Sequence, residues 1–167
     1  SRLVLVNDTY TNVKQVIYDK GFHPISGILL DLGLSSDQLQ NSGRGFSFQT
    51  NEPLDMRFSP DENELTAAII LNEWTKEKLV NIFFEYGEEK MANRIADAII
   101  EKRQQDPIRT TLQLVSLIIN TVPRRKTKIH PATKIFQALR IAVNNELTNV
   151  KLFLKDLTDI KVEPIYQ

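Results

Sequence analysis

One carboxylate lies at a position in the sequence where enzymes of the α/β class carry out their chemistry. Asp31 stands at the carboxyl end of a short apolar run, residues 28–32, which Gly27 and Gly33 bound and in which polar and apolar residues do not alternate. Such a run fits a parallel strand that is buried on both faces. Ligands of open α/β sheets bind just beyond the carboxyl ends of strands, so Asp31 is a candidate for catalysis or ligand binding. An aspartate that caps the following turn is equally compatible with this position.

A basic tract in the second half of the chain is the best candidate for contact with phosphate. It contains Arg124, Arg125, Lys126 and Lys128, and His130 follows it before a proline. Lysine and arginine neutralise RNA phosphates, but charged runs between helices are also common as solvated connectors. We expect His130 to be structural or to contact RNA. With two histidines and no cysteine in the chain, a histidine-based nucleophile or a metal site is not expected.

The composition is that of an ordinary globular domain. The chain has 167 residues and a formal net charge of zero, so a broad positive field for a polyanion is not expected. No apolar run is long enough to cross a bilayer, and the start carries no secretory leader. The absence of cysteine excludes disulfides and thiolate metal sites. These features predict a cytoplasmic protein whose RNA contacts, if any, are local or come from other segments.

The elements before Asp31 predict the sheet that would position it. Residues 2–6 are apolar and β-branched, which is typical of a strand, and residues 10–20 have apolar positions on one helical face. Together with the strand at 28–32, they form a strand–helix–strand unit. Such a unit implies parallel strands joined by a right-handed crossover.

The segment after this unit predicts a long irregular loop. Residues 41–60 contain glycines and prolines without a period, and such loops within compact domains are usually functional. Phe46 and Phe48 suit either a base-stacking role or a place in the core. Asp55 and Arg57 are spaced for a surface ion pair of little consequence.

The rest of the chain is predicted to be mostly helical. Amphipathic patterns predict helices over residues 64–72, 76–86, 88–103, 112–122 and 132–154. In the last helix the expected buried stripe is Phe136, Leu139, Val143, Leu147 and Val150, and a polar stripe beside it is Gln137, Arg140 and Asn144.

Five motifs taken together resemble one enzyme family. They are Asp31-Leu-Gly-Leu-Ser-Ser-Asp-Gln-Leu39, Arg44-Gly-Phe-Ser-Phe48, Pro53-Leu-Asp-Met-Arg57, Glu85-Tyr-Gly-Glu-Glu89, and His130 to Ile141 running on to Asn145-Glu-Leu147. In this order and at this spacing, they closely resemble the bacterial small-subunit (16S) rRNA (cytosine-N4)-methyltransferases of the MraW type. These enzymes use S-adenosylmethionine as the methyl donor.

The resemblance implies a fold and a division into domains. The expected fold is a partial Rossmann-like α/β domain of a class I methyltransferase with an inserted helical domain. Residues 1–64 would be part of the α/β domain, residues 65–129 the helical insertion that recognises substrate, and residues 130–167 the return helix of the α/β domain.

The resemblance also implies roles for individual residues. Asp31 and Gln38 would bind S-adenosylmethionine, and Tyr10 lies where the family has a phenylalanine that packs on the cofactor. An aromatic residue at a helix start that only packs on the sheet is the alternative for Tyr10. Asp31 is in addition the catalytic candidate, because a strand-end carboxylate can accept a hydrogen bond from the exocyclic amine of cytosine.

One part of a class I methyltransferase is not found in the sequence. Gly43-Arg-Gly45 is the only Gly-x-Gly motif and follows no predicted strand, so it cannot be the glycine-rich cofactor loop. Residues 156–167 also depart from the family pattern. We therefore expect a middle portion of a methyltransferase that lacks the N-terminal cofactor half and the C-terminal strands.

The implied partners follow from the same resemblance. The substrate would be 16S rRNA or the small ribosomal subunit, with no metal and no membrane, and a homodimer is left open. The chain alone would bind S-adenosylmethionine weakly or not at all. The alternative function is a non-catalytic helical module that contacts RNA or the ribosome.

Overall fold

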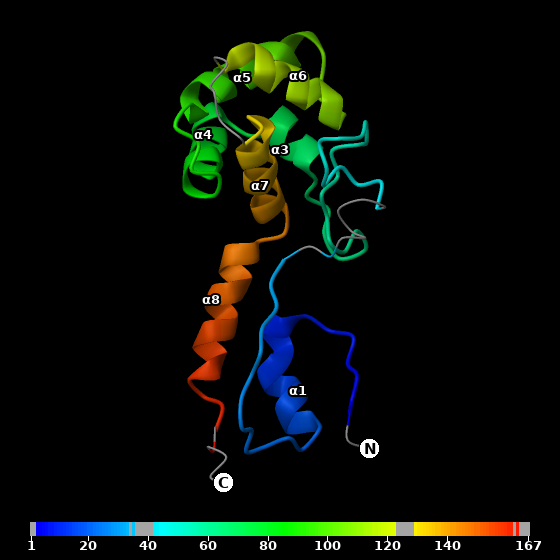
Figure 1. Cartoon of the computed structure of the whole chain (residues 1–167), viewed down its shortest axis with the longest axis vertical. Coiled ribbons are helices and arrows are strands. Elements are labelled where there is room, and N and C mark those ends of the chain that lie inside the picture. The colour runs from blue at the N-terminus through cyan, green and yellow to red at the C-terminus, as the bar shows by residue number, and fades with distance from the viewer. Residues whose placement is uncertain (1–2, 34, 36–41, 123–128, 162, 164–167) are drawn as a thin grey trace. The chain divides into compact units, whose positions relative to one another are not determined.

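The structure is a computed structural model that describes residues 3–33, 35, 42–122, 129–161 and 163. Contacts between residues divide the chain into two units. The terminal unit comprises Ser1–Gly33 and Asn145–Gln167, and the central unit comprises Leu34–Asn144. Figure 1 shows the helices of both units. The domain boundaries predicted from the family resemblance, at 64/65 and 129/130, differ from the boundaries of these two units and stay a prediction.

The central unit contains five helices among its described residues. They are α3 (Ala67–Glu73), α4 (Lys76–Glu85), α5 (Ala92–Gln105), α6 (Thr111–Thr121) and α7 (Ala132–Val143). Helix α7 contacts α3, α4 and α6, and Figure 1 shows it among the other helices. The fully buried side chains that these helices share include Ile70, Phe83, Ile95, Leu114 and Leu139.

Three threonines cap the starts of three of these helices. The side chains of Thr66, Thr75 and Thr110 accept hydrogen bonds from backbone N–H groups in the first turns of α3, α4 and α6. Gln113 completes a capping box at the start of α6. The helices predicted over residues 64–72, 76–86, 88–103 and 112–122 are therefore confirmed, with boundaries that differ by up to four residues.

The largest of these differences is at the start of α5, which begins at Ala92 and not at residue 88. Glu88 has a positive φ of 50°, which ends the preceding helix in a tight turn. Gly87 lies against α7 so closely that a Cβ atom there would be 2.5 Å from the carbonyl oxygen of Lys134. The turn between α4 and α5 is thus fixed by packing on α7.

The terminal unit contains η1 (Tyr10–Asn12), α1 (Val13–Asp19) and α8 (Glu146–Leu157) among its described residues. Helix α8 contacts both η1 and α1, and a 2.7 Å ion pair joins Lys14 Nζ to Asp159 Oδ2. The described apolar side chains buried in this unit are only Ile17, Phe153 and Ile160. The terminal unit therefore has a far smaller core than the central unit.

The single helix predicted over residues 132–154 is wrong. The chain leaves α7 after Val143, and Asn145 adopts a left-handed conformation with φ 50° before α8 begins. Asparagine tolerates this conformation better than most residues, which explains the break at this point. Leu147, predicted in the buried stripe, is 44% exposed on α8.

The two predicted strands are also wrong for the chain as the structure describes it. No strand is assigned among the described residues, and Leu5 and Leu29, in the segments 2–6 and 28–32, are 86% and 95% exposed. A strand is stabilised by hydrogen bonds to a neighbouring strand. Since no strand is assigned to the described residues of either segment, the predicted buried α/β sheet is not formed by the described part of the chain.

One short pairing of backbone groups does occur in the terminal unit. The N–H of Ile25 donates to the carbonyl of Lys161 (3.2 Å), and the N–H of Glu163 donates to the carbonyl of Ile25 (2.9 Å). In a parallel ladder, the N–H and the carbonyl of one residue bond to two residues of the neighbouring strand that are two positions apart, as they do here. The segments that begin at Ile25 and Lys161 therefore run side by side in parallel at this point.

None of the helices in the described part of the chain has the length and apolar character needed to cross a bilayer.

Candidate functional site

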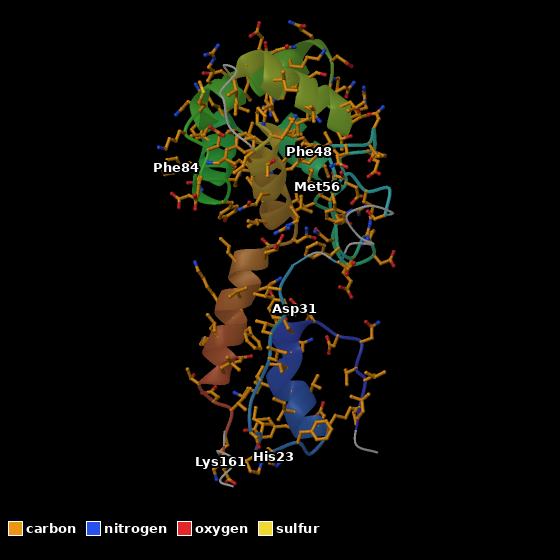
Figure 2. The ribbon with its side chains drawn as sticks, viewed as in Figure 1. His23, Asp31, Phe48, Met56, Phe84 and Lys161 are labelled. Atoms are coloured by element: carbon orange, nitrogen blue, oxygen red, sulfur yellow. The ribbon has the colours of Figure 1, made fainter. Side chains whose placement is uncertain are left out.

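Asp31, the predicted catalytic carboxylate, is exposed in the terminal unit (Figure 2). The preceding Leu29 and Leu30 carry no regular secondary structure. The carboxylate of Asp31 forms no recorded hydrogen bond or ion pair with another described residue, so no capping interaction is seen within them. It is therefore free to accept a hydrogen bond or to face a cation. Its role in catalysis or cofactor binding stays a prediction.

Tyr10, the predicted cofactor-packing aromatic, lies at the start of η1 and is half-buried. Its ring meets that of Phe153 on α8 edge-on, with centroids 5.7 Å apart and an interplanar angle of 85°. Burial, and next the negative charge of Glu146, raise the pKa of the Tyr10 phenol. The hydroxyl is thus neutral at physiological pH. The Tyr10 ring thus packs against Phe153 of α8, and a contact with cofactor stays a prediction.

Several of the predicted site residues lie outside the described residues. They are Gln38, Arg124, Arg125, Lys126 and Lys128. Their predicted roles in binding cofactor or RNA are therefore not placed by the structure.

His130 is described, and it lies just before α7 in the central unit. Its Nδ1 accepts a hydrogen bond from the backbone N–H of Ala132 (3.2 Å). Its ring stacks on that of Phe48 at 4.7 Å between centroids and 16° between planes, and Phe48 in turn meets Phe136 edge-on. These contacts tie the start of α7 to the loop that contains Phe48, which supports a structural part for His130.

The most elaborate polar arrangement of the described chain lies in the irregular segment of residues 42–63, here called the 42–63 loop. Its centre is a forked ion pair in which Arg57 Nε and Nη2 donate to the two carboxylate oxygens of Asp55, at 2.9 and 2.7 Å. The backbone N–H of Arg57 also donates to Asp55 (3.0 Å), and Arg57 Nη1 donates to the carbonyl of Asn63 (2.8 Å). The guanidinium of Arg57 holds the pKa of Asp55 below its usual range.

The prediction of an inconsequential surface pair is therefore wrong. Both side chains of the pair are only 21% exposed, and both also bond to backbone groups of the loop. A bidentate arginine–carboxylate pair of this kind is stronger and more specific in geometry than an exposed lysine pair. Asp55 and Arg57 hold the loop in one conformation.

Between the two charged residues lies a strained position. Met56 has a positive φ of 59° and is 0% exposed, which is unusual for a residue with a long side chain. Its N–H donates to the carbonyl of Arg44 (2.8 Å), and its carbonyl accepts from Asn144 Nδ2 (2.8 Å). Asn144 Oδ1 accepts from the N–H of Phe58 (2.8 Å). A single side chain from the end of α7 thus clamps the backbone on both sides of the ion pair.

The other end of the loop is held by Arg44 and by a close backbone approach. Arg44 Nη1 donates to the carbonyls of Arg57 (2.7 Å) and Phe58 (2.9 Å). Gly45 has a φ of +75°, and a Cβ atom there would lie 2.3 Å from the carbonyl oxygen of Pro53. Only glycine fits this position.

The two phenylalanines for which base stacking and core packing were both open differ in the structure. Phe46 is 6% exposed and stacks on Phe58, with centroids 5.7 Å apart, so it belongs to the core. Phe48 is half-buried between His130 and Phe136. Neither ring is free on both faces.

Sequence reasoning missed Asn63 and Arg44 as anchors of the loop and placed Asn144 only in a polar stripe. Asn63 Nδ2 donates to the carbonyl of Val143 (2.7 Å), next to the Asn144 clamp. The available signal was the presence of two asparagines, Asn144 and Asn145, in an otherwise continuous helical pattern. Side chains of asparagine often bond to backbone groups where a helix ends.

The described residues do not by themselves make a site for S-adenosylmethionine. The carboxylate of Asp31 is exposed, the ring of Tyr10 packs on Phe153, and no glycine-rich turn follows a strand within the described chain. A cofactor of this size needs a concave site that covers most of its surface. Among the described residues no cluster of His, Asp or Glu is placed to hold a metal ion.

Comparison with known proteins identifies close relatives. The chain is 49% identical over 146 residues to the ribosomal RNA small subunit methyltransferase H of Thermomicrobium roseum. The aligned residues make up 87% of this chain and 44% of that relative. This chain is 51% identical over 151 residues to the protein of the same name from Dehalococcoides mccartyi (90% and 42%). The relative of that name from Desulfosudis oleivorans is 43% identical over 166 residues (98% and 53%). The chain spans about half the length of the curated relatives it matches.

A family-level comparison agrees and covers nearly the whole chain. The sequence model of the MraW methylase family matches residues 1–163. The match includes residues up to 163, so the segment from residue 156 follows the family further than its sequence suggested. On this evidence the chain belongs to the MraW methylase family.

Proposed function

We propose that the protein functions as part of an S-adenosylmethionine-dependent methyltransferase that modifies the exocyclic N4 of a cytidine in small-subunit (16S) rRNA. The observation that carries this proposal is the family match over residues 1–163, with relatives named ribosomal RNA small subunit methyltransferase H. Because these relatives are about twice as long as the matched segment, we propose that activity requires the rest of such a protein.

The terminal unit supports a Rossmann-like domain in that longer protein. Leu5 and Leu29, in its two apolar segments, are 86% and 95% exposed, whereas a buried parallel sheet would cover such side chains on both faces. The parallel bonds from Ile25 to Lys161 and Glu163 mark where two adjacent strands of such a sheet would begin. We propose that additional strands cover these segments and bring the end of the 28–32 segment to the edge of a cofactor cleft.

Asp31 is the residue of this chain that we propose for the reaction site. The exocyclic amine of cytosine is a poor nucleophile, because its lone pair is delocalised into the ring. A carboxylate that accepts a hydrogen bond from this amine would orient the nitrogen and favour its attack. Asp31 has the required free acceptor oxygens, and it would equally suit the ammonium group of the cofactor.

The central unit is proposed to recognise the RNA. It has a large core of its own, and its 42–63 loop is held by Arg57, Asp55 and Asn144 in a single strained conformation. Strained backbone that is fixed by several independent contacts is found most often at functional sites. Such a surface could present a looped or single-stranded rRNA segment, in which the target base is already unstacked.

A non-catalytic RNA- or ribosome-binding module is the second candidate. The unequal cores of the two units favour it, since the central unit is well packed while the terminal unit buries few apolar side chains. On this alternative the chain would bind RNA and never take part in methyl transfer.

Product analysis distinguishes the two candidates. A purified protein that contains this chain and has the full length of its relatives is incubated with small-subunit rRNA and S-adenosylmethionine labelled in the methyl group. The RNA is then digested, and its nucleosides are separated by mass. We expect labelled N4-methylcytidine from this protein and none from the 167-residue chain. If RNA is bound but no nucleoside acquires the label, the module is the correct function.

A further inference from the structure

We propose that a hollow between α4 and α5 binds one unstacked base of single-stranded RNA, with the ring of Phe84 as its stacking surface. The hollow has a volume of about 580 Å³ and lies wholly within the central unit. The residues that line it are Lys76, Glu77, Val80, Asn81, Phe84 and Asn93. This proposal rests on the proposed function only in naming rRNA as the source of the base.

Phe84 is the feature that distinguishes this hollow. It is 58% exposed, whereas its neighbour Phe83 on the same helix is fully buried. Figure 2 shows Phe84 at the outer side of α4, and no other described aromatic ring contacts it. Val80 lies one turn before Phe84 on the same helix face and adds a second apolar side chain to the lining of the hollow. A flat ring can therefore stack on Phe84 from solvent.

Two amide side chains stand beside this ring. Asn81 comes from α4 and Asn93 from α5, and both are exposed. Neither side chain has a recorded hydrogen bond to another described residue. An amide presents donors and an acceptor together, which is what the edge of a nucleobase requires.

The charged groups at the rim are already engaged. Lys76 Nζ forms an ion pair with Asp97. A hydrogen bond from the backbone N–H of Glu77 itself, and next one from the hydroxyl of Thr75, lower the pKa of Glu77. The hollow is therefore close to neutral. Binding there would come from stacking and base-edge hydrogen bonds, so the Phe84 contribution should change little with salt, unlike phosphate contacts.

The lining favours a base over a protein partner. Val80 and Phe84 are its only apolar side chains, whereas the buried centres of protein interfaces are broad and apolar. A nucleobase combines apolar faces with a polar edge. That combination matches one exposed ring beside two free amides.

The experiment measures binding of a fluorescein-labelled, single-stranded 12-nucleotide RNA of mixed sequence to the 167-residue chain by fluorescence anisotropy. Phe84→Ala and Phe84→Leu are compared with Phe84→Trp and with Leu112→Ala, a control on α6 whose leucine is 44% exposed. Loss of one stacked base should weaken binding by roughly 5-fold or more in both Phe84→Ala and Phe84→Leu. Phe84→Trp should retain wild-type affinity, and Leu112→Ala should stay within about twofold of it.

The leucine variant separates stacking from apolar docking, and it also guards against a folding defect, because it keeps an apolar side chain at this position. Wild-type affinity in Phe84→Leu, or no binding of the RNA by the wild-type chain, would overturn the proposal. The same holds if light scattering shows that Phe84→Ala changes only the oligomeric state, because the surface is then a contact between copies of the chain.

A second readout locates the base directly. A 4-thiouridine in the same RNA should crosslink to the tryptic peptide of residues 79–90, with the modified position at Asn81 or Phe84. Crosslinks found only elsewhere would contradict the proposal. Neither assay contains S-adenosylmethionine, so the site at Phe84 can be confirmed even if the protein transfers no methyl group. If the protein methylates RNA but binds it independently of Phe84, only the proposed base site is refuted, and the proposed function stands.

Discussion

Replacement of Asn144 by alanine should destabilise the central unit although the residue lies at the end of a helix. The side chain donates to the carbonyl of Met56 and accepts from the N–H of Phe58, both at 2.8 Å. Each hydrogen bond lost is worth about 1 kcal/mol, and more where the abandoned group is shielded from water. Met56 also needs outside support for its positive φ, at a cost of order 1 kcal/mol. We expect the free energy of unfolding to fall by about 2–3 kcal/mol.

The assay is urea denaturation followed by the fluorescence of Trp74, the single tryptophan, which lies in the central unit. Asn144→Asp is the informative second variant. It keeps the acceptor for Phe58 but places a carboxylate oxygen against the carbonyl of Met56, so it should be destabilised nearly as much as Asn144→Ala. Asn120→Ala, at an exposed position on α6, is the matched control and should change stability by less than about 0.5 kcal/mol.

A loss below about 0.5 kcal/mol in Asn144→Ala would refute the reasoning, because the 42–63 loop would then be held without this clamp. Equal stability of Asn144→Asp and the wild type would show that the bond to the carbonyl of Met56 contributes nothing.

Three further predictions follow from named contacts. Asp31→Ala in the longer protein should abolish methylation while circular dichroism stays unchanged, because the side chain is exposed; wild-type turnover would remove Asp31 from the site. Arg57 lowers the pKa of Asp55 in the folded state, so the stability from this pair is present above pH about 4 and is lost as pH falls through the folded pKa; acid titration of Arg57→Ala should show a smaller loss than the wild type, and an equal loss would contradict the assignment. Gly87→Ala places a Cβ 2.5 Å from a carbonyl of α7 and should cost about 1–3 kcal/mol in urea denaturation, whereas Gly27→Ala, with nothing within 4 Å, should be neutral; equal effects would count against the close approach.

The helices of the central unit were predictable because their signals are local. Thr75 and Thr110 each precede an amphipathic run and cap it through their own side chains. These contacts span three residues, so they are visible in the sequence. Even the break after Val143 had a local sign in the two asparagines that follow it.

The strands and the loop could not be read in the same way. An apolar run such as residues 28–32 indicates that its burial is favourable, but whether it forms a strand depends on neighbouring strands from other parts of the chain. The clamp of Asn144 on Met56 joins residues 88 apart, and no spacing rule reports such a contact. Asp55 and Arg57 show the same limit: their separation suggested a pair, but only the surrounding backbone groups make it structural.

The family resemblance supplied what local patterns could not. Asp31 alone was ambiguous between a helix cap and a site carboxylate, and the match to the MraW methylase family gives it a context. The chain spans about half the length of these relatives, and we propose that the geometry of the site depends on the other half.

The most direct test of this account is the binding of S-adenosylmethionine measured by titration calorimetry on three proteins: the 167-residue chain, a protein of the full length of its relatives, and the Asp31→Ala variant of the latter. We expect binding to the full-length protein, weaker binding or none to its Asp31→Ala variant, and no measurable heat with the 167-residue chain. A micromolar dissociation constant for the 167-residue chain alone would contradict the claim that its carboxylate acts in a cleft completed by other segments.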